Sequence, residues 1–140
     1  MNTILGKSNP TVWDLVGFLY SGETMASWTM AKTAKPGDMF FIGLSGPQAG
    51  IYAVAKILNS PQLLPGCDDE FTKEPGWFDK PRWRSDIRII KSFVDTPISD
   101  SILANSPELL RISDWLHNQG THTILSEIEA NQLSRLAKIK

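Results

Sequence analysis

The chain has 140 residues, of which 41% are hydrophobic and 21% charged, and its formal net charge is −1. This composition is typical of a globular domain rather than a disordered chain, and a charge so near zero gives no overall attraction to a polyanion. The longest apolar runs, 39–44 and 50–55, are too short to cross a membrane. We expect one domain over residues 1–140, in the cytoplasm, because the first residues contain no secretory signal.

The single cysteine and the two histidines give no sign of a metal site or a catalytic centre. Cys67 lies in an acidic turn, and neither His117 nor His122 stands beside it at the spacing of metal ligands or of a catalytic pair. We therefore expect no metal, no cofactor and no catalytic residue. Cys67 is interpreted as a structural or incidental thiol.

The first third of the chain predicts a helix, a strand and a tight turn. Apolar residues recur at helical spacing over 12–19, and Ser21-Gly22 ends the pattern. Residues 24–30 are expected to form a strand, and the Lys-Pro-Gly-Asp sequence of 35–38 a turn.

The middle of the chain predicts a hairpin, a long surface segment and another strand. Strands over 39–44 and 51–58 are expected to pair antiparallel across the short glycine-flanked loop 45–50. Prolines, glycines and acids over 62–80 predict a long excursion on the surface. Polar and apolar residues then alternate from 83 to 94, which predicts a long strand with one face in water.

The last third predicts short helices and one more strand. Residues 97–99 begin a helix whose core side chains are expected to be Ile102 and Leu103, and a second helical turn follows near 107–112. After Gly120, β-branched residues predict a strand.

The final helix completes the expected fold. A capping-box pattern over 126–129 begins this helix, whose predicted apolar stripe consists of Ile128, Leu133, Leu136 and Ala137. The order of elements predicts a mixed α/β domain of the α+β type. It is expected to be built round a small, strongly curved antiparallel sheet or barrel, flanked by short helices.

Trp28 is the residue that most strongly suggests a binding function. It precedes the Pro36-Gly37 turn, and Lys32 and Lys35 lie between the two. A flat indole face with cations beside it suits stacking on a nucleobase. The alternative is that Trp28 fills the core and that Pro36-Gly37 only supplies the dihedral angles of a turn.

A local excess of positive charge lies further along the chain. Five Lys and Arg residues occur over 80–91 against the single acid Asp86, whereas acids collect over 68–74 and 95–108. This separation of charge predicts one basic face, the alternative being a solvated face of a strand. The residues expected to contact phosphates are Lys32, Lys35, Arg82, Arg84 and Arg88.

Several short motifs follow one another in order over nearly the whole chain. They are Asn9-Pro10 before Trp13, then Trp28, Lys35-Pro-Gly-Asp38 before a strand, Gly50-Ile51, Ser60-Pro61, and Asn118-Gln119-Gly120 before Thr123-Ile124. Their order and spacing resemble the EVE domain, a branch of the PUA-like β-barrel superfamily that also contains the YTH and ASCH domains. Within that branch the chain is most similar to EVE domains that accompany modification-dependent restriction nucleases.

The resemblance implies a pocket in the barrel that accepts one flipped, chemically modified base between aromatic walls. In this chain it implies that Trp28 stacks on the base and that Asn9 and Gln119 read its edge, because an amide offers both a donor and an acceptor. The alternatives are that Asn9 caps the helix after Pro10 and that Gln119 is a turn residue.

The second aromatic wall is where the chain departs from its relatives. Ser8 stands where relatives often carry an aromatic residue, so that Trp83 or Tyr52 would have to supply this wall. Ser8, Ser45 and Thr121 are the further residues expected in the pocket.

The predicted function is that of a non-enzymatic reader of a modified base in DNA or RNA. The candidate bases are methylated or hydroxymethylated cytosine and methyladenine, and a nuclease partner would be a separate chain. One alternative is a hydrolase of modified nucleosides, as some ASCH relatives are, with Lys32, Thr33 and Glu23 as candidate reactive groups. Another is a module that binds a protein or a small molecule, which the low net charge and Ser8 favour.

Overall fold

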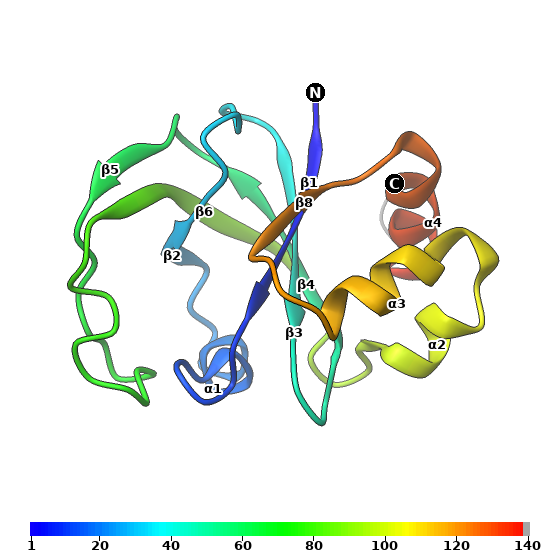
Figure 1. Cartoon of the computed structure of the whole chain (residues 1–140), viewed down its shortest axis with the longest axis horizontal. Helices are drawn as coiled ribbons and strands as arrows, with labels where there is room; N and C mark the ends of the chain where they lie inside the picture. The colour runs from blue at the N-terminus through cyan, green and yellow to red at the C-terminus, as the bar shows by residue number, and fades with distance from the viewer. Residues whose placement is uncertain (139–140) are drawn as a thin grey trace.

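The computed structural model describes residues 1–138, and a strongly curled sheet forms its centre (Figure 1). The path of hydrogen-bonded strands runs β2-β6-β4-β3-β1-β8, while β5 pairs with β6 and β7 with β4. Among the described residues all named pairs are antiparallel except β1 with β3. The strands are β1 (Thr3–Ser8), β2 (Met25–Thr29), β3 (Met39–Leu44), β4 (Gly50–Ile57), β5 (Gln62–Leu64), β6 (Arg82–Ser92), β7 (Ile98–Ser99) and β8 (His122–Ile124).

Short helices accompany the sheet. Three of them gather on one side of β3 and β4, and α1 lies apart from them near one end of the curl (Figure 1). Within residues 1–138 no helix is long and apolar enough to span a membrane. The helices are α1 (Leu15–Tyr20), α2 (Asp100–Ala104), α3 (Leu110–Leu116) and α4 (Glu127–Leu136), with a 3-10 turn at Pro107–Leu109.

The central strands are buried on both faces because successive side chains enter two different cores. Ile4 and Phe40 point into the curl, whereas their neighbours Leu5 and Phe41 pack against the three gathered helices. This arrangement explains why 39–44 is a continuous apolar run rather than an alternating one. The helices contribute Leu103, Leu109, Ile112, Leu116 and Leu133 to the second core.

Most of the predicted elements are confirmed. The strands expected over 24–30, 39–44, 51–58 and 83–94 are present as β2, β3, β4 and β6, and the hairpin across 45–50 is antiparallel. The strand after Gly120 is β8, and the final helix begins with the expected capping box. The mixed fold with a strongly curved sheet is therefore confirmed.

The first helix is shorter than predicted. It begins at Leu15, because the side chain of Asp14 accepts a hydrogen bond from the backbone nitrogen of Gly17 at 3.0 Å and caps the helix there. Val12 is buried outside the helix, and Trp13 forms a β-bridge to Thr72. The helical spacing of the apolar residues thus extended beyond the helix itself.

Two side chains expected in the core lie in solvent. Ile102 is 43% exposed and Ile128 is 66% exposed, so both predictions were wrong. Consecutive helical residues point about 100° apart, so the burial of Leu103 turns Ile102 outward. The buried members of the predicted stripe are Leu133 in α4 and Ala137 just after it, four residues apart, and Ile128 in the first turn falls outside them.

Strands β1, β5 and β7 were not predicted, and β7 occupies residues 98–99, where the sequence predicted only the start of a helix. β1 pairs in parallel with β3, with Thr3 opposite Met39 and Ser8 opposite Leu44. Its partner lies more than thirty residues away in sequence, so no local turn signal announces the pairing. β5 lies inside 62–80, where the sequence predicted only a surface excursion.

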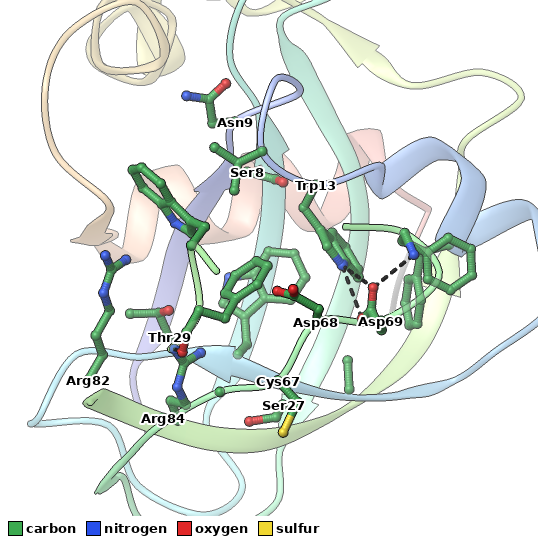
Figure 2. Close-up of a pocket in the computed structure, with 18 of the residues that line it drawn as sticks. Ser8, Asn9, Trp13, Ser27, Thr29, Cys67, Asp68, Asp69, Arg82 and Arg84 are labelled. Atoms are coloured by element: carbon green, nitrogen blue, oxygen red, sulfur yellow. Dashed lines mark hydrogen bonds between the residues drawn. The ribbon is translucent and has the colours of Figure 1, made fainter. Parts of the chain in front are cut away.

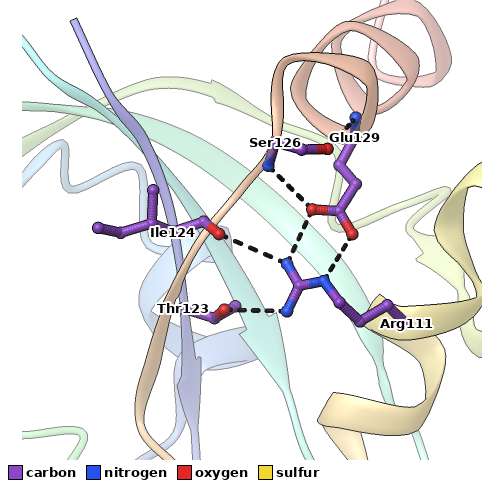
Figure 3. A network of polar contacts seen from close by, with 5 residues as sticks. All are labelled: Arg111, Thr123, Ile124, Ser126 and Glu129. Carbon is purple, nitrogen blue, oxygen red and sulfur yellow. Dashed lines mark hydrogen bonds and ion pairs between the residues drawn. The ribbon is translucent and has the colours of Figure 1, made fainter.

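Arg111 joins three elements through one polar network (Figure 3). Its guanidinium binds both carboxylate oxygens of Glu129, at 2.7 and 2.8 Å, and also donates to the Thr123 hydroxyl at 3.0 Å. Glu129 in turn accepts from the backbone nitrogen of Ser126 at 2.9 Å, which completes the capping box of α4. The network ties α3 to β8 and to the start of α4.

This network predicts a pH-dependent stability. Hydrogen bonding to Arg111 is the main cause that lowers the pKa of Glu129 below its usual 4.5. Its stabilisation is therefore complete above about pH 4.5 and is lost as the pH falls through the lower folded pKa. We expect Glu129→Gln to flatten this acid dependence in urea unfolding.

A matched variant separates the charge from the cap. Glutamine can keep the bond to the Ser126 nitrogen, so Glu129→Ala should cost about 1 kcal/mol more at pH 7 than Glu129→Gln. Equal losses in the two variants would contradict a role for Glu129 in capping.

Candidate functional site

The two ends of the curled sheet, β2 and β8, come close together without pairing as strands. The His122 imidazole on β8 crosses the gap and donates from Nε2 to the carbonyl oxygen of Thr29, at the end of β2, at 2.6 Å. His122 Nδ1 lies 2.9 Å from the hydroxyl of Thr121. The curl is thus joined at this point by a side chain, and beyond it the gap between β2 and β8 stays open.

The surroundings of His122 favour its neutral form. Burial lowers the pKa of His122 below its usual 6.5, and the hydrogen bond to Thr29 opposes that shift only in part. The ring of Phe40 lies beside the imidazole, with ring centroids 6.2 Å apart. Phe40 can reach this position because residue 6 is glycine, where a Cβ would stand 2.5 Å from the Phe40 ring.

A cavity of about 750 Å³ occupies the open part of the gap (Figure 2). Its volume lies within the roughly 300–1,000 Å³ range of small-ligand sites. The walls come from β2, from the end of β1 and the turn after it, from residues 65–78, and from the start of β6 and of β8. Its aromatic lining consists of Trp13, Phe18, Trp28, Phe71, Trp77 and Phe78.

Trp28 belongs to both the core and the cavity. Its ring meets Trp13 edge to face at 5.2 Å and Phe40 at 6.0 Å, and the side chain is half-buried. Trp28 also lines the cavity, so the indole is held in place by aromatic neighbours without being sealed. The two interpretations drawn from the sequence, core residue and stacking residue, are therefore compatible.

Trp13, the aromatic neighbour of Trp28, is fixed by a carboxylate. The indole nitrogen of Trp13 donates to both oxygens of Asp69, at 3.0 and 3.1 Å (Figure 2). Asp69 also accepts from the backbone nitrogen of Phe71 at 2.8 Å, which holds the ring of Phe71 near Trp13. The segment 65–78 is thereby attached to the barrel wall.

The cavity also receives backbone polar groups. The backbone nitrogen of Ile89 donates to the Thr24 carbonyl and that of Met30 to the Trp83 carbonyl. These bonds show which residues of β2 are hydrogen-bonded to β6. By the alternation of antiparallel ladders, Ser27 and Thr29 then direct their N–H and C=O groups away from β6. Both residues line the cavity, and within residues 1–138 no second strand pairs with β2.

Buried Arg84 holds the far end of the 65–78 segment. Its guanidinium donates to the carbonyl oxygens of Leu64 at 3.1 Å and of Phe78 at 3.3 Å, and burial lowers its pKa. Arg84 is only 4% exposed, and its role in these contacts is to attach the segment to β6. The charged residues that line the cavity are Lys7, Arg82 and Arg84, and the acids Glu23, Asp68, Asp69 and Glu70.

The structure brings four of the six predicted pocket residues to this cavity. Trp28, Ser8, Asn9 and Thr121 line it, with Ser8 and Asn9 at one edge of the view in Figure 2. Gln119 is exposed and lies outside the lining.

Ser45 also lies outside this lining, and Asn9, which belongs to it, is held in a local turn. Ser45 lines a separate hollow of about 210 Å³ beside Pro10, and its hydroxyl donates to the Ser8 carbonyl at 3.3 Å. The side chain of Asn9 accepts from the nitrogen and hydroxyl of Thr11, which makes a local turn, whereas Asp14 caps the helix.

The predicted phosphate contacts divide in the same way. Arg82 and Arg84 line the cavity, whereas Lys32, Lys35 and Arg88 are exposed and lie outside its lining.

Neither candidate for the second aromatic wall lines the cavity. Tyr52 is 6% exposed and donates to the Gln48 carbonyl, and Trp83 is half-buried beneath the Lys32 ammonium. Of the candidate reactive groups, Glu23 lines the cavity, whereas Lys32 and Thr33 do not. Within residues 1–138 no group of three His, Cys, Asp or Glu side chains is placed to hold a metal ion.

Trp13 and the residues of 65–78 form the part of the site that the sequence prediction missed. Asp68 points into the middle of the cavity in Figure 2, and its carboxylate accepts from the backbone nitrogen of Gly76 at 3.1 Å. Phe71, Trp77 and Phe78 within a polar, proline-rich segment were the available signal, because such side chains seldom occur in a solvated loop without a packing or binding role.

Comparisons with known proteins reveal the fold and no near relative. No family model matches this chain, and no curated protein matches it. Solved structures do match: the protein PSPTO5229 of Pseudomonas syringae is 19% identical with a TM-score of 0.69, over 96% of this chain and 99% of that one.

Two human structures are similar over nearly the whole chain. Human THYN1, solved in complex with 5-methylcytosine containing DNA, is 13% identical with a TM-score of 0.68, over 100% of this chain and 99% of that one. The DUF55 domain of human thymocyte nuclear protein 1 is 16% identical with a TM-score of 0.66, over 99% of both chains. At these identities the likeness establishes the fold alone, a strongly curved sheet with short helices as expected from the sequence.

The buried imidazole generates a prediction for the site. Just below pH 6.5 the unfolded chain protonates His122 more readily than the folded chain does. The free energy of unfolding should therefore decrease as the pH is lowered below 6.5. The slope from this group is at most about 1.4 kcal/mol per pH unit. His122→Gln should flatten the slope in urea unfolding.

The second histidine provides the matched control. His117 is half exposed and pairs with Asp100 at 2.7 Å, away from the cavity lining. The slope due to His122 should therefore persist in His117→Gln. An unaltered pH profile in His122→Gln would contradict a buried, neutral imidazole at the gap.

Proposed function

We propose that this protein binds nucleic acid by taking one modified base, flipped out of its stack, into the cavity between β2 and segment 65–78. The observation that carries the proposal is the placement of Trp28. Its ring is held edge-on by Trp13 and Phe40, and it lines a cavity of about 750 Å³. A fixed aromatic ring beside a hollow of this size offers a stacking surface at little entropic cost.

The human structure with bound DNA favours a cytosine derivative. Human THYN1 has the same fold and was solved with DNA that contains 5-methylcytosine. We infer that 5-methylcytosine is the first candidate for this chain, with 5-hydroxymethylcytosine and N6-methyladenine after it. Each of these bases carries an exocyclic amino group, which needs an acceptor.

The polar lining suits such a base edge. The carboxylate of Asp68 and the C=O group of Ser27 can accept from an amino group, and the N–H groups of β2 can donate to ring acceptors. The aromatic walls give a methyl group an apolar surface. Flipping costs a few kcal/mol of stacking and pairing, which stacking on Trp28 and these hydrogen bonds would offset.

The same lining favours a reader over a hydrolase. Glu23 lies at the cavity, but Lys32 and Thr33, the other two candidate reactive groups, do not. We therefore propose a binding domain without catalysis, and we assign any cleavage of the bound nucleic acid to a separate nuclease chain.

A panel of matched oligonucleotides tests the proposed function. The same sequence would carry 5-methylcytosine, 5-hydroxymethylcytosine, N6-methyladenine or no modification, with dissociation constants measured by titration at two salt concentrations. We expect one modified base to bind at least about tenfold more tightly than its unmodified counterpart, a difference of about 1.4 kcal/mol. Equal binding to all four that disappears at high salt would end the proposal.

Substitution of Trp28 tests the stacking role. Trp28→Ala should weaken binding of the preferred oligonucleotide by about 1–3 kcal/mol, and Trp28→Phe should retain part of the affinity because a ring remains. Thermal unfolding of both variants checks that the aromatic cluster survives. A folded Trp28→Ala protein with unchanged affinity would show that the ring serves only the core.

A further inference from the structure

Three pairs of a cation and a tryptophan occur around the cavity. Lys7 Nζ lies 4.3 Å from the ring centroid of Trp115, Lys32 Nζ 4.9 Å from that of Trp83, and Arg82 Cζ 5.2 Å from that of Trp77. These distances are those of cation–π pairs. Lys7, Trp77 and Arg82 line the cavity itself. We call these six residues the basic-aromatic rim.

Hydrogen bonds link the strands that carry the rim residues. The backbone nitrogen of Lys7 donates to the Thr121 carbonyl at 3.2 Å. The next residue, His122, donates from Nε2 to the Thr29 carbonyl at 2.6 Å. Met30, which follows Thr29, donates to the carbonyl of Trp83 at 2.8 Å. Lys7 and the Arg82–Trp77 pair line the cavity, whereas the Lys32–Trp83 pair and Trp115 lie outside its lining on neighbouring parts of these strands and of α3.

Three of the four acids that line the cavity, Asp68, Asp69 and Glu70, come from the 65–78 segment, and the fourth is Glu23. Figure 2 shows Arg82 on the other side of the view from Asp69. A polyanionic backbone would be repelled by the acidic side and attracted to the rim. The protein's net charge of −1 therefore conceals a local basic path beside the cavity.

The aromatic members of the rim have stacking surface to offer. Trp77 is 41% exposed although it is a large apolar side chain, and Trp83 and Trp115 are half-buried. A cation on one face of such a ring leaves the other face for a base. Bases inside a duplex have both faces covered by their neighbours, so only an unpaired, unstacked nucleotide can use these rings.

We propose that the partner is a single-stranded nucleic acid, whose nucleotides next to the flipped base lie along the basic-aromatic rim. A neighbouring base stacks on Trp77, and phosphates contact Lys7, Lys32 and Arg82. This inference rests on the proposed function for the base that enters the cavity. It adds that affinity depends on the flanking strand and that an unpaired strand is preferred.

The test compares three ligands that carry the same modified base, each measured beside its unmodified counterpart: the free nucleoside, a single-stranded nonamer and the corresponding duplex. Dissociation constants are measured for the complete chain by titration. The nonamer should bind at least about tenfold more tightly than the nucleoside, because each additional stacked base and each phosphate contact strengthens binding. It should also bind more tightly than the duplex.

Variants of the rim give the decisive readout, which is the ratio of nonamer affinity to nucleoside affinity. Trp77→Ala should lower this ratio by about 5- to 150-fold, the range for loss of one stacked base. Lys32→Gln should reduce the salt dependence of nonamer binding by about one phosphate contact. Tyr20→Ala, which removes an exposed aromatic side chain outside the cavity lining, should leave both affinities unchanged.

The outcomes separate the two proposals. A nucleoside and a nonamer that both show no preference for modification overturn the proposed function. A clear preference together with an unchanged ratio in Trp77→Ala and an unchanged salt dependence in Lys32→Gln overturns the rim alone. Duplex binding equal to or tighter than that of the nonamer also overturns the rim, and thermal unfolding confirms that each variant is folded.

Discussion

The candidate site exists because the curled sheet closes through a side chain instead of a ladder of backbone hydrogen bonds. His122 spans the gap to Thr29, and beyond this contact β2 keeps one edge unpaired within the described residues. A full ladder would have filled the gap with strands and left no room for a ligand. A wider gap would have exposed the inner core around Phe40 to water. The distance between β2 and β8 that the His122 imidazole sets thus keeps the inner core covered and leaves room for a cavity.

The aromatic residues of this region serve packing and exposure together. Trp13 and Trp28 meet edge to face, and Asp69 fixes the indole nitrogen of Trp13. Edge contacts of this kind immobilise a ring while leaving part of its face uncovered. A ring fixed in advance loses little freedom when a base stacks on it, so the stability of the inner core and affinity for a flat ligand draw on the same contacts.

Sequence patterns predicted the elements that local signals define. The capping box of α4 and the hairpin of β3 and β4 depend on residues close together in the chain, and both are confirmed. The parallel pairing of β1 with β3 depends on a distant partner, and the sequence gives no local sign of it. The site was likewise only partly predictable. Trp28 was recognisable beside its basic neighbours, but the wall around Asp68 and Trp77 depends on how segment 65–78 folds back.

Arg84 separates the part of the chain whose position is fixed by packing from a segment whose exposed residues are free to vary. It holds the carbonyls at 64 and 78, so the chain between these two points leaves the sheet and returns at fixed positions. Changes at the exposed positions of that span, with Asp69 and Phe71 kept for their contacts with Trp13, would alter the shape and charge presented to a guest while the strand register stays as it is. Descendants of such a protein could thus acquire new ligand preferences through these positions, at little risk to folding.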